Sequence, residues 1–280
     1  VDDVLAPDLL HRLQAIAAGT APNMIEVEAG GRLFALLVVS VFEFESINIY
    51  GTDITAAREV ERANAENERL LLNILPASIA ERLRHGEGLI ADRFEEVAVL
   101  FADVVGFTPL AAALTPTQAV HVLNEIFSIF DNLAEAHGLE KIKTSGDSYM
   151  VVGGLTPQSA GQVERVALMG LEMIDELASY RTAEGRKLEI RVGLHIGPAV
   201  GGVIGLKKFI YDVWGDTVNT ASRMESHGEA GKIQVSEATY QRLKGICSFE
   251  PRGTIEVKGK GPMSTYFLAG RKPVKQVSDG

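Results

Sequence analysis

The stretch LFADVVGFT, residues 100 to 108, contains the features on which the fold prediction rests. It completes an apolar run from Val97 to Phe101, which is typical of a buried strand, and it continues into a turn that contains Gly106. Asp103 therefore lies at the end of a strand, just before a turn that opens onto a helix. Backbone N–H groups in such a turn can bind phosphate. Taken alone, an aspartate here is more often a turn former than a metal ligand.

Two further stretches carry polar residues in suggestive positions. In KIKTSGDSY, residues 141 to 149, Ser145 and Gly146 predict the tip of a hairpin, and Asp147 follows them. In YDVWGDTVNTASRM, residues 211 to 224, a helix is expected from Thr217 onward. Asn219 and Arg223 are four residues apart on that helix, so both can reach the same ligand.

Strands and helices alternate from about Phe94 to the C-terminal region. The pattern predicts an α/β sandwich with helices over one mixed sheet. Strands are expected over 96–104, 188–195, 199–204, 232–235, 253–257 and 265–268, with a hairpin over 140–153. Helices are expected over 117–137, 159–180, 217–226 and 237–244.

The N-terminal part, residues 1–54, predicts a small β domain after a short helix over 6–18. Strands are expected at Met24–Glu28, Arg32–Phe44 and Ser46–Tyr50, with Gly30 and Gly31 at the first turn. The exit INIYGTDIT, residues 47 to 55, resembles the last strand of PAS sensor domains, of which about half is present. A plain β-meander is the alternative.

A charged segment without Gly or Pro follows from Thr55 to about Leu75. Apolar or small residues recur at near-heptad spacing, namely Val60, Ala63, Leu70 and Ile74. The pattern predicts a parallel two-helix coil, with a lone amphipathic connector as the alternative. Pro76 interrupts it, and the glycines around Glu87 indicate a linker.

Composition limits the classes of function. A content of 46% hydrophobic and 23% charged residues is that of a globular chain, and the net charge of −10 argues against nucleic acid or an anionic membrane as partner. Cys247 is the single cysteine, which fits a reducing compartment. The longest apolar stretch, Leu33 to Phe42, is too short to span a bilayer, for which about 20 residues are needed. Because the chain begins at Val1, we expect a fragment of a longer protein.

The three motifs together resemble class III adenylyl cyclases. The resemblance covers about Phe94 to Gly270 and includes RVGLH at 191–195 and VKGKG at 257–261. It implies a ferredoxin-like α+β catalytic domain over 94–272, preceded by a signalling helix and transducer element over 55–93 and the partial PAS-like segment over 1–54, with a tail over 273–280. A cytoplasmic location is implied, either free or as the cytosolic part of a longer membrane-bound protein.

The resemblance also implies a role for each matching residue. Two divalent cations, Mg²⁺ or Mn²⁺, would be held by Asp103 and Asp147. Lys143 and Asp212 would read the base, Asn219 would orient the ribose, and Arg223 would stabilise charge on the α-phosphate. The remaining positions implied in substrate binding are Val104, Val105, Gly106, Phe107, Thr108, Arg191 and Lys258.

The base-reading pair favours ATP as substrate and cyclic AMP as product. Adenine offers an acceptor at N1 and a donor amine at N6, which match a Lys donor and an Asp acceptor. Guanine inverts both edges, and an acceptor facing an acceptor costs about 1–3 kcal/mol. Guanylyl cyclases usually carry Glu and a small residue at the two positions. A guanylyl cyclase is nevertheless the first alternative, and a silent nucleotide-binding module is the second.

In this family the metal residues come from one subunit and the Lys, Asp, Asn and Arg set from the other. The chain carries both sets, so a homodimer with two composite sites is expected. Diguanylate cyclases share the general fold, but their Gly-Gly-Asp/Glu-Glu-Phe hairpin is replaced here by residues 145–149. Tyr211 and Trp214 are interpreted as core residues rather than base-stacking ones, and His195 as a core or interface side chain.

Overall fold

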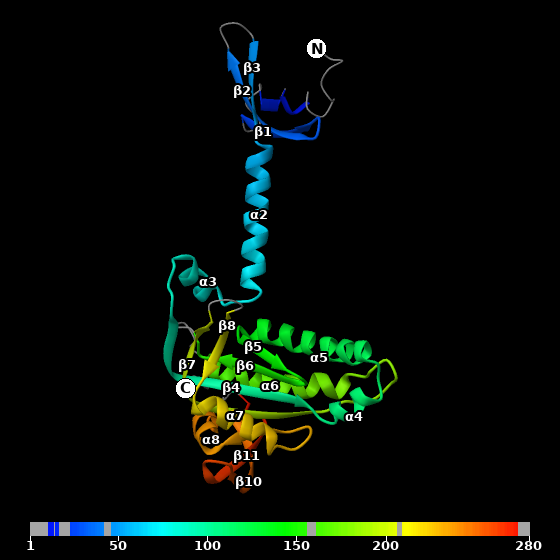
Figure 1. Ribbon diagram of the computed structural model, residues 1–280, viewed down its shortest axis with the longest axis vertical. Helices are drawn as coiled ribbons and strands as arrows, with labels where there is room; N and C mark the ends of the chain where they lie inside the picture. Colours follow the sequence, from blue (N-terminus) through cyan, green and yellow to red (C-terminus); the bar gives the residue numbers. More distant parts are fainter. Residues whose placement is uncertain are drawn as a thin grey trace, which may run out of the picture. The chain divides into compact units, whose positions relative to one another are not determined.

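The computed structural model describes residues 11–273 except 14, 17–22, 42–45, 156–160 and 206–208. The chain divides into two compact units, Val1–Ile74 and Leu75–Gly280, which are described separately (Figure 1). None of the helices in these described ranges combines the length and the apolar character that crossing a bilayer requires.

The first unit contains an antiparallel sheet in the order β1 (Met24–Ala29), β2 (Arg32–Val41) and β3 (Ser46–Asp53). Gly30 and Gly31 form the first turn in the left-handed region, with φ of 59° and 72°. The expected helix over 6–18 is present at 11–13 and 15–16, and its other residues lie outside the described ranges, as does part of the strand expected to reach Phe44. This β-meander is common to both interpretations of the segment.

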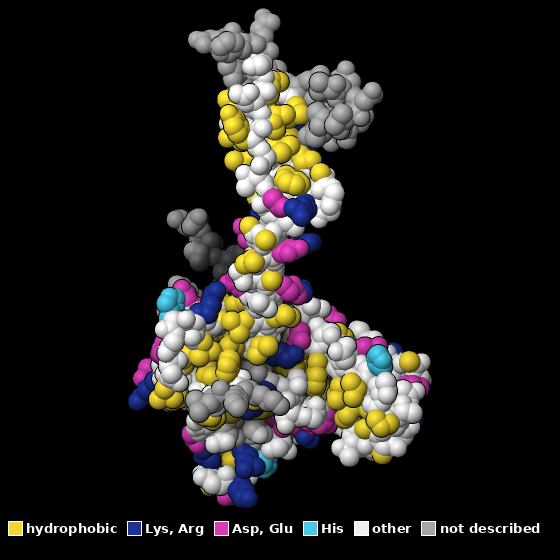
Figure 2. Space-filling model, turned by 45° about the horizontal axis from the view of Figure 1, so that its top comes forward, with side chains coloured by type: hydrophobic (Ala, Val, Ile, Leu, Met, Phe, Trp, Pro, Cys, Tyr) yellow, Lys and Arg dark blue, Asp and Glu magenta, His cyan; other side chains and the backbone are white. Residues whose placement is uncertain are grey.

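Helix α2 (Thr55–Leu72) follows β3 and has no buried residue. Several of its apolar residues are exposed, at 60% for Val60, 50% for Leu70 and 43% for Leu72. Figure 2 shows such side chains among acidic and basic ones along the helix. A helix of this length is marginal in water when it buries nothing, because helical stability comes mainly from packing.

The second unit is built on a mixed sheet in the order β10-β11-β9-β7-β4-β6-β5, with β8 paired to the outer half of β7. Strands β7 and β9 are parallel, and the other pairs are antiparallel. The strands are β4 (Ile90–Val104), β5 (Glu140–Ser145), β6 (Ser148–Gly153), β7 (Ile190–Ile204), β8 (Ile210–Trp214), β9 (Ile233–Ser236), β10 (Cys247–Val257) and β11 (Gly261–Arg271). The helices are α3 (Ala77–Arg84), α4 (Phe107–Ala112), α5 (Pro116–His137), α6 (Gln162–Ser179), α7 (Asp216–Ser226) and α8 (Glu237–Leu243).

The α/β sandwich with a mixed sheet expected from the sequence is confirmed, although several element bounds differ, among them the start of β10 at Cys247 rather than Gly253. β4 begins at Ile90, ahead of the strand expected from Glu96. β7 is one continuous strand where two were expected, because its pairing with β4 persists on both sides of a bulge. β8 was not expected as a strand, because Asp212 interrupts its apolar residues.

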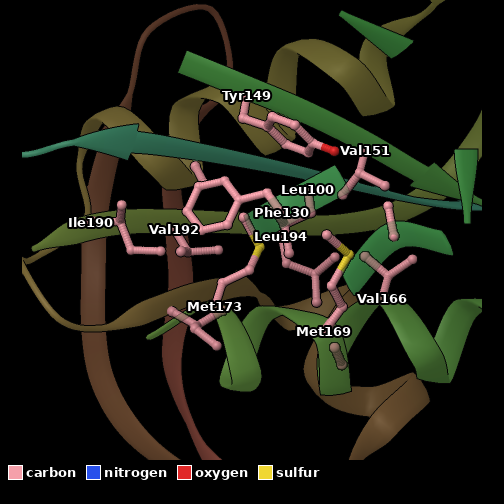
Figure 3. Packing of buried hydrophobic residues seen from close by; sticks show 14 of the residues in the cluster. Leu100, Phe130, Tyr149, Val151, Val166, Met169, Met173, Ile190, Val192 and Leu194 are labelled. Atoms are coloured by element: carbon pink, nitrogen blue, oxygen red, sulfur yellow. The ribbon is translucent and has the colours of Figure 1, made fainter. Parts of the chain in front are cut away.

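The alternation of side chains along β4 separates two cores. Ala98, Leu100, Ala102 and Val104 point into the larger one, where α5 and α6 cover the sheet. Figure 3 shows Leu100 there with Phe130, Tyr149, Met169 and Met173. The odd-numbered residues point into a smaller core on the other face, which α7 closes; they are Val97, Val99 and Phe101. Asp103 is the next member of the odd-numbered series.

Candidate active site

Asp103 and Asp147 are brought together at one end of the central strands. Asp103 lies near the end of β4, opposite Ser148 of β6, and Asp147 occupies the turn immediately before that residue. The Val104 amide donates to the Asp147 carbonyl oxygen at 3.3 Å, which ties the two segments. Burial, followed by the negative charges of Asp147 and Glu225, raises the pKa of Asp103 to about 6, although Arg191 opposes the rise.

Arg191 lies opposite Asp103 in the pairing of β4 with β7. Its Nη2 donates to Asp103 Oδ2 at 3.2 Å, and its Nε donates to Glu225 Oε1 at 2.8 Å. Glu225 belongs to α7 and its side chain is only 10% exposed. Sequence reasoning missed Glu225. The available signal was its position four residues after the small apolar Ala221, which places both on the same face of the helix.

The loop after β4 offers fewer free amides than the sequence suggested. The N–H groups of Val104 and Val105 donate to backbone oxygens, those of Asp147 and Glu189. Gly106 takes a left-handed conformation, φ 72°, immediately before α4. Phe107 and Thr108 form the first turn of that helix, where amides have no acceptor within the helix. Any anion bound by this loop would therefore meet residues 106–108 rather than all five.

Lys143 and Asp212 form a direct ion pair although 69 residues separate them. Lys143 Nζ donates to Asp212 Oδ2 at 2.5 Å, and Oδ1 of the same carboxylate accepts the Val213 amide at 2.8 Å. The pair joins β5 to the unexpected strand β8. The side chain of Asp212 is 16% exposed and that of Lys143 is 42% exposed. The Asp212 carboxylate is therefore held in place, whereas the Lys143 ammonium group has room to move.

Asn219 and Arg223 lie one turn apart on α7, as the sequence predicted. Lys258 is exposed in the turn that joins β10 to β11. Within the described residues, the side chains of Asn219, Arg223 and Lys258 form no hydrogen bond or ion pair with the protein. Lys260, in the same turn as Lys258, pairs with Asp216 at the start of α7. Two uncompensated cations are therefore available to an anionic ligand.

Other polar and aromatic residues near the site have structural partners. Tyr211 is 7% exposed, which confirms its interpretation as a core residue, whereas Trp214 is only half-buried. His195 Nδ1 and the Ser236 hydroxyl are 2.6 Å apart, and burial lowers the pKa of the imidazole to about 4. His195 is thus a half-buried, hydrogen-bonded side chain, which fits its interpretation as a core or interface residue.

No group of three or more His, Cys, Asp or Glu side chains in the described ranges forms a metal-holding cluster. Two carboxylates nevertheless suit Mg²⁺ or Mn²⁺ when a substrate supplies further oxygens, because Mg²⁺ is commonly bound by one or two carboxylates together with phosphates. Asp103 and Asp147 fit a divalent cation because the two carboxylates repel each other, and a bound cation would compensate both negative charges.

Comparison with known proteins identifies the family of the chain. The family described as "Adenylate and Guanylate cyclase catalytic domain" matches residues 89–270. An adenylate cyclase of Mycobacterium tuberculosis is 48% identical over 225 residues, which are 78% of this chain and 51% of that protein. Human atrial natriuretic peptide receptor 2 is 46% identical over 211 residues, 73% of this chain and 20% of the receptor. The chain thus spans about half the length of the mycobacterial relative and 20% of the length of the receptor.

Among solved structures, the guanylate cyclase domain of RhGC from Catenaria anguillulae, in complex with GTP, superposes with a TM-score of 0.63. The two are 37% identical, and the match covers 65% of this chain and all of that one. Both sequence and fold lead to the same family. The chain therefore belongs to the adenylate and guanylate cyclase catalytic domain family, the class III nucleotidyl cyclases.

Proposed function

We propose that the chain converts ATP to 3′,5′-cyclic AMP and pyrophosphate in a homodimer with two composite sites. The observation that carries this proposal is the Lys143–Asp212 pair, in a chain that also holds the Asp103, Asp147 and Arg191 set. Overall similarity does not select the base, because the chain resembles both an adenylate cyclase and a guanylate cyclase domain solved in complex with GTP.

Adenine fits the pair without a change of protonation. Lys143 would donate to N1, and Asp212 Oδ2, now facing Lys143, would accept from the N6 amine. The second carboxylate oxygen is fixed by the Val213 amide, so Asp212 cannot readily turn away from the base. Guanine would present its O6 to this carboxylate, and two facing acceptors cost about 1–3 kcal/mol.

Asp103 and Asp147 would hold two divalent cations. When bound, the cations supply activation of the ribose 3′-hydroxyl and neutralisation of the phosphate charge. Arg191 and Lys258 would hold the phosphates, Asn219 would orient the ribose, and Arg223 would stabilise the charge that develops on the α-phosphate, for which its planar fork of donors is suited. The 3′-oxygen forms the new bond to the α-phosphorus as the bond to pyrophosphate breaks in line.

A second copy of the chain is required in this proposal. One subunit would supply Asp103, Asp147 and Arg191, and its partner would supply Lys143, Asp212, Asn219, Arg223 and Lys258. A two-fold axis then creates two equivalent sites. The helix α2 would bring the copies together as a parallel coil, and the N-terminal unit would regulate the catalytic domain through it by shifting a conformational population.

The test measures cyclic nucleotide formed from ATP and from GTP, each with Mn²⁺ or Mg²⁺. The parent is compared with Asp103→Ala and Arg223→Ala, and with Asp175→Ala and Arg186→Ala as exposed controls of the same residue types. Each active-site variant should lose about a hundredfold or more in kcat with ATP. The controls should retain parental activity.

Mixing the two inactive variants tests the shared site. After random exchange half of the dimers are mixed and each has one complete site, so about one quarter of parental activity should return. Preference for GTP would make the chain a guanylyl cyclase. A dimeric parent inert with both nucleotides would support the alternative of a binding module, and no recovery on mixing would contradict the composite site.

A further inference from the structure

The C-terminal end of α7 is pressed against β7 with no intervening space. A Cβ atom added to Gly193 of β7 would lie 1.9 Å from the Glu225 nitrogen and 2.6 Å from the Ala221 carbonyl oxygen. A Cβ on Gly228, just beyond the helix, would lie 2.8 Å from Arg191 Cγ. The backbones of α7 and β7 can approach this closely only at glycine. The close contact fixes the position of α7 and therefore the positions that the Glu225 side chain can reach.

The N-terminal end of α7 is held as well. The Thr217 hydroxyl donates to the Pro198 carbonyl oxygen at 2.6 Å, and Lys260 pairs with Asp216 from the β10–β11 turn. The helix is 11 residues long and fixed at both ends, so a displacement at one end moves the whole element. Asn219 and Arg223 lie between these two attachments.

Glu225 provides the polar attachment at the C-terminal end. Its carboxylate is buried and accepts from Arg191 Nε at 2.8 Å, while Arg191 Nη2 donates to Asp103. The two contacts use different nitrogens of the guanidinium. Arg191 therefore stays held by Glu225 when Asp103 engages another cation, and the carboxylate of Glu225 is not left as an unpaired buried charge.

We propose that Glu225 is a positioning residue through which α7 connects the two half-sites of one subunit. The same helix presents Asn219 and Arg223 to one composite site and, through Glu225, sets Arg191 beside the metal carboxylates of the other. This inference rests on the proposed homodimer. Nothing in it requires Glu225 to touch the nucleotide.

The test uses mixed dimers of two separately tagged chains, Asp103→Ala and Arg223→Ala, purified by both tags. Such a dimer has one complete site, with its metal set on the Arg223→Ala chain and its Arg223 set on the Asp103→Ala chain. Glu225→Gln is placed on either chain in turn. Gln keeps the size and a hydrogen-bond acceptor but removes the charge.

On the Arg223→Ala chain, Glu225→Gln should raise KM for the nucleotide about tenfold, because Arg191 of the complete site loses its charged partner. On the Asp103→Ala chain it should lower kcat at least fivefold, although Arg191 of that chain lies outside the complete site. Glu229→Gln, an exposed acidic residue four positions later, should change neither. A kcat within twofold of the unmodified mixed dimer in the second arrangement overturns the proposal.

A binding measurement separates this inference from the proposed function. Calorimetric titration of the otherwise unmodified chain with Mn²⁺ and 3′-deoxy-ATP, which lacks the attacking hydroxyl, should show about tenfold weaker binding for Glu225→Gln than for the parent and for Glu229→Gln. If the parent binds 3′-deoxy-ATP but forms no cyclic product from ATP, the proposed function fails while the role of Glu225 is still judged by affinity. Equal affinity of parent and Glu225→Gln overturns the role of Glu225, and so does a parent that binds no nucleotide.

Discussion

At the scale of single residues, the partly buried carboxylate of Asp212 is the group on which base selection depends in the proposed function. Its two oxygens accept from Lys143 and from the Val213 amide, so the side chain is oriented before any ligand arrives. A preoriented acceptor discriminates well, because a mismatched ligand leaves it without a partner.

Replacing Asp212 by alanine should therefore lower kcat/KM for ATP by about 5- to 150-fold, since the lost interaction is worth about 1–3 kcal/mol. The kcat/KM for GTP should change less, so the ratio of kcat/KM for ATP to kcat/KM for GTP should fall. Steady-state kinetics with both nucleotides checks this. Asp175→Ala, on the exposed side of α6, is the matched control, and an unchanged ATP-to-GTP ratio in Asp212→Ala would contradict the assignment.

Glu140, at the start of β5, is a residue with a pH-dependent effect on folding. Burial raises the pKa of its carboxyl from 4.5 to about 7. A raised carboxyl pKa means that the folded chain favours the neutral form. The stability that Glu140 contributes is thus complete below pH 4.5 and is lost as the pH rises through about 7.

Glu140→Gln should accordingly be more stable than the parent at pH 8.5, by about 1–2 kcal/mol for a group that keeps some contact with water. At pH 5 the difference should nearly vanish. Urea unfolding at the two pH values measures it, with the exposed Glu135→Gln as control. Parallel pH dependences for the parent and Glu140→Gln would show that the carboxyl is not held neutral.

At the scale of elements, α2 and the two residues that follow it carry a regular seam that contains one polar residue. Spacings of four and three residues alternate along the seam positions Ala56, Val60, Ala63, Asn67, Leu70 and Ile74. In a parallel coil with Ala63 and Leu70 at d positions, Asn67 occupies an a position. Asn at a lowers stability but favours two strands in one register.

Asn67→Ile should tighten self-association of the chain and allow trimers or tetramers, because Ile at a no longer selects two strands. Sedimentation velocity over a range of concentrations measures both effects. Ala65→Ile changes a small residue to the same β-branched one outside the seam and should leave the stoichiometry unchanged. If Asn67→Ile also leaves association unchanged, α2 is a lone connector.

The contact of α7 with β7 gives a second prediction at this scale. Gly193→Ala would place a Cβ 1.9 Å from the Glu225 nitrogen, so the helix must move away. The free energy of unfolding should fall by about 3 kcal/mol, which corresponds to a decrease in Tm of about 6–12 °C for a unit of this size. Gly88→Ala, where a Cβ meets nothing within 4 Å, should have little effect. If a thermal melt gave the same Tm for Gly193→Ala and for the parent, α7 would not be closely packed against β7.

At the scale of the whole molecule, the division between Ile74 and Leu75 gives a natural point for truncation. A chain of residues 75–280 keeps β4 complete, whereas a cut before Phe94 would remove the part of β4 that pairs with Val200–Val203 of β7. The truncated chain retains every residue proposed for the active site but lacks α2.

Residues 75–280 should dimerise more weakly than the full chain, because the coil no longer raises the effective concentration of the two catalytic domains. Specific activity should therefore fall with dilution in the truncated chain and stay constant in the full chain. Activity measured from nanomolar to micromolar protein, beside sedimentation, checks this. Identical concentration dependence would exclude α2 from dimerisation, and unchanged regulation would exclude it from signalling.

The sequence by itself determined the local features and the family. The run from Val97 to Phe101 predicted the central strand, the four-residue spacing of Asn219 and Arg223 predicted their common helical face, and three motifs led to the cyclases. The spacing of Asn219 and Arg223 follows the helical repeat, and the apolar run and the motifs are contiguous, so each can be recognised within a short window.

Only the tertiary structure decided which distant residues meet. Strand β8 brings Asp212 to Lys143, and the close packing of α7 on Gly193 brings Glu225 to Arg191. Neither contact has a local signature, because each depends on strand register and helix docking between segments far apart in the chain. The free energy of those long-range contacts belongs to the assembled sheet, which no short stretch of residues specifies.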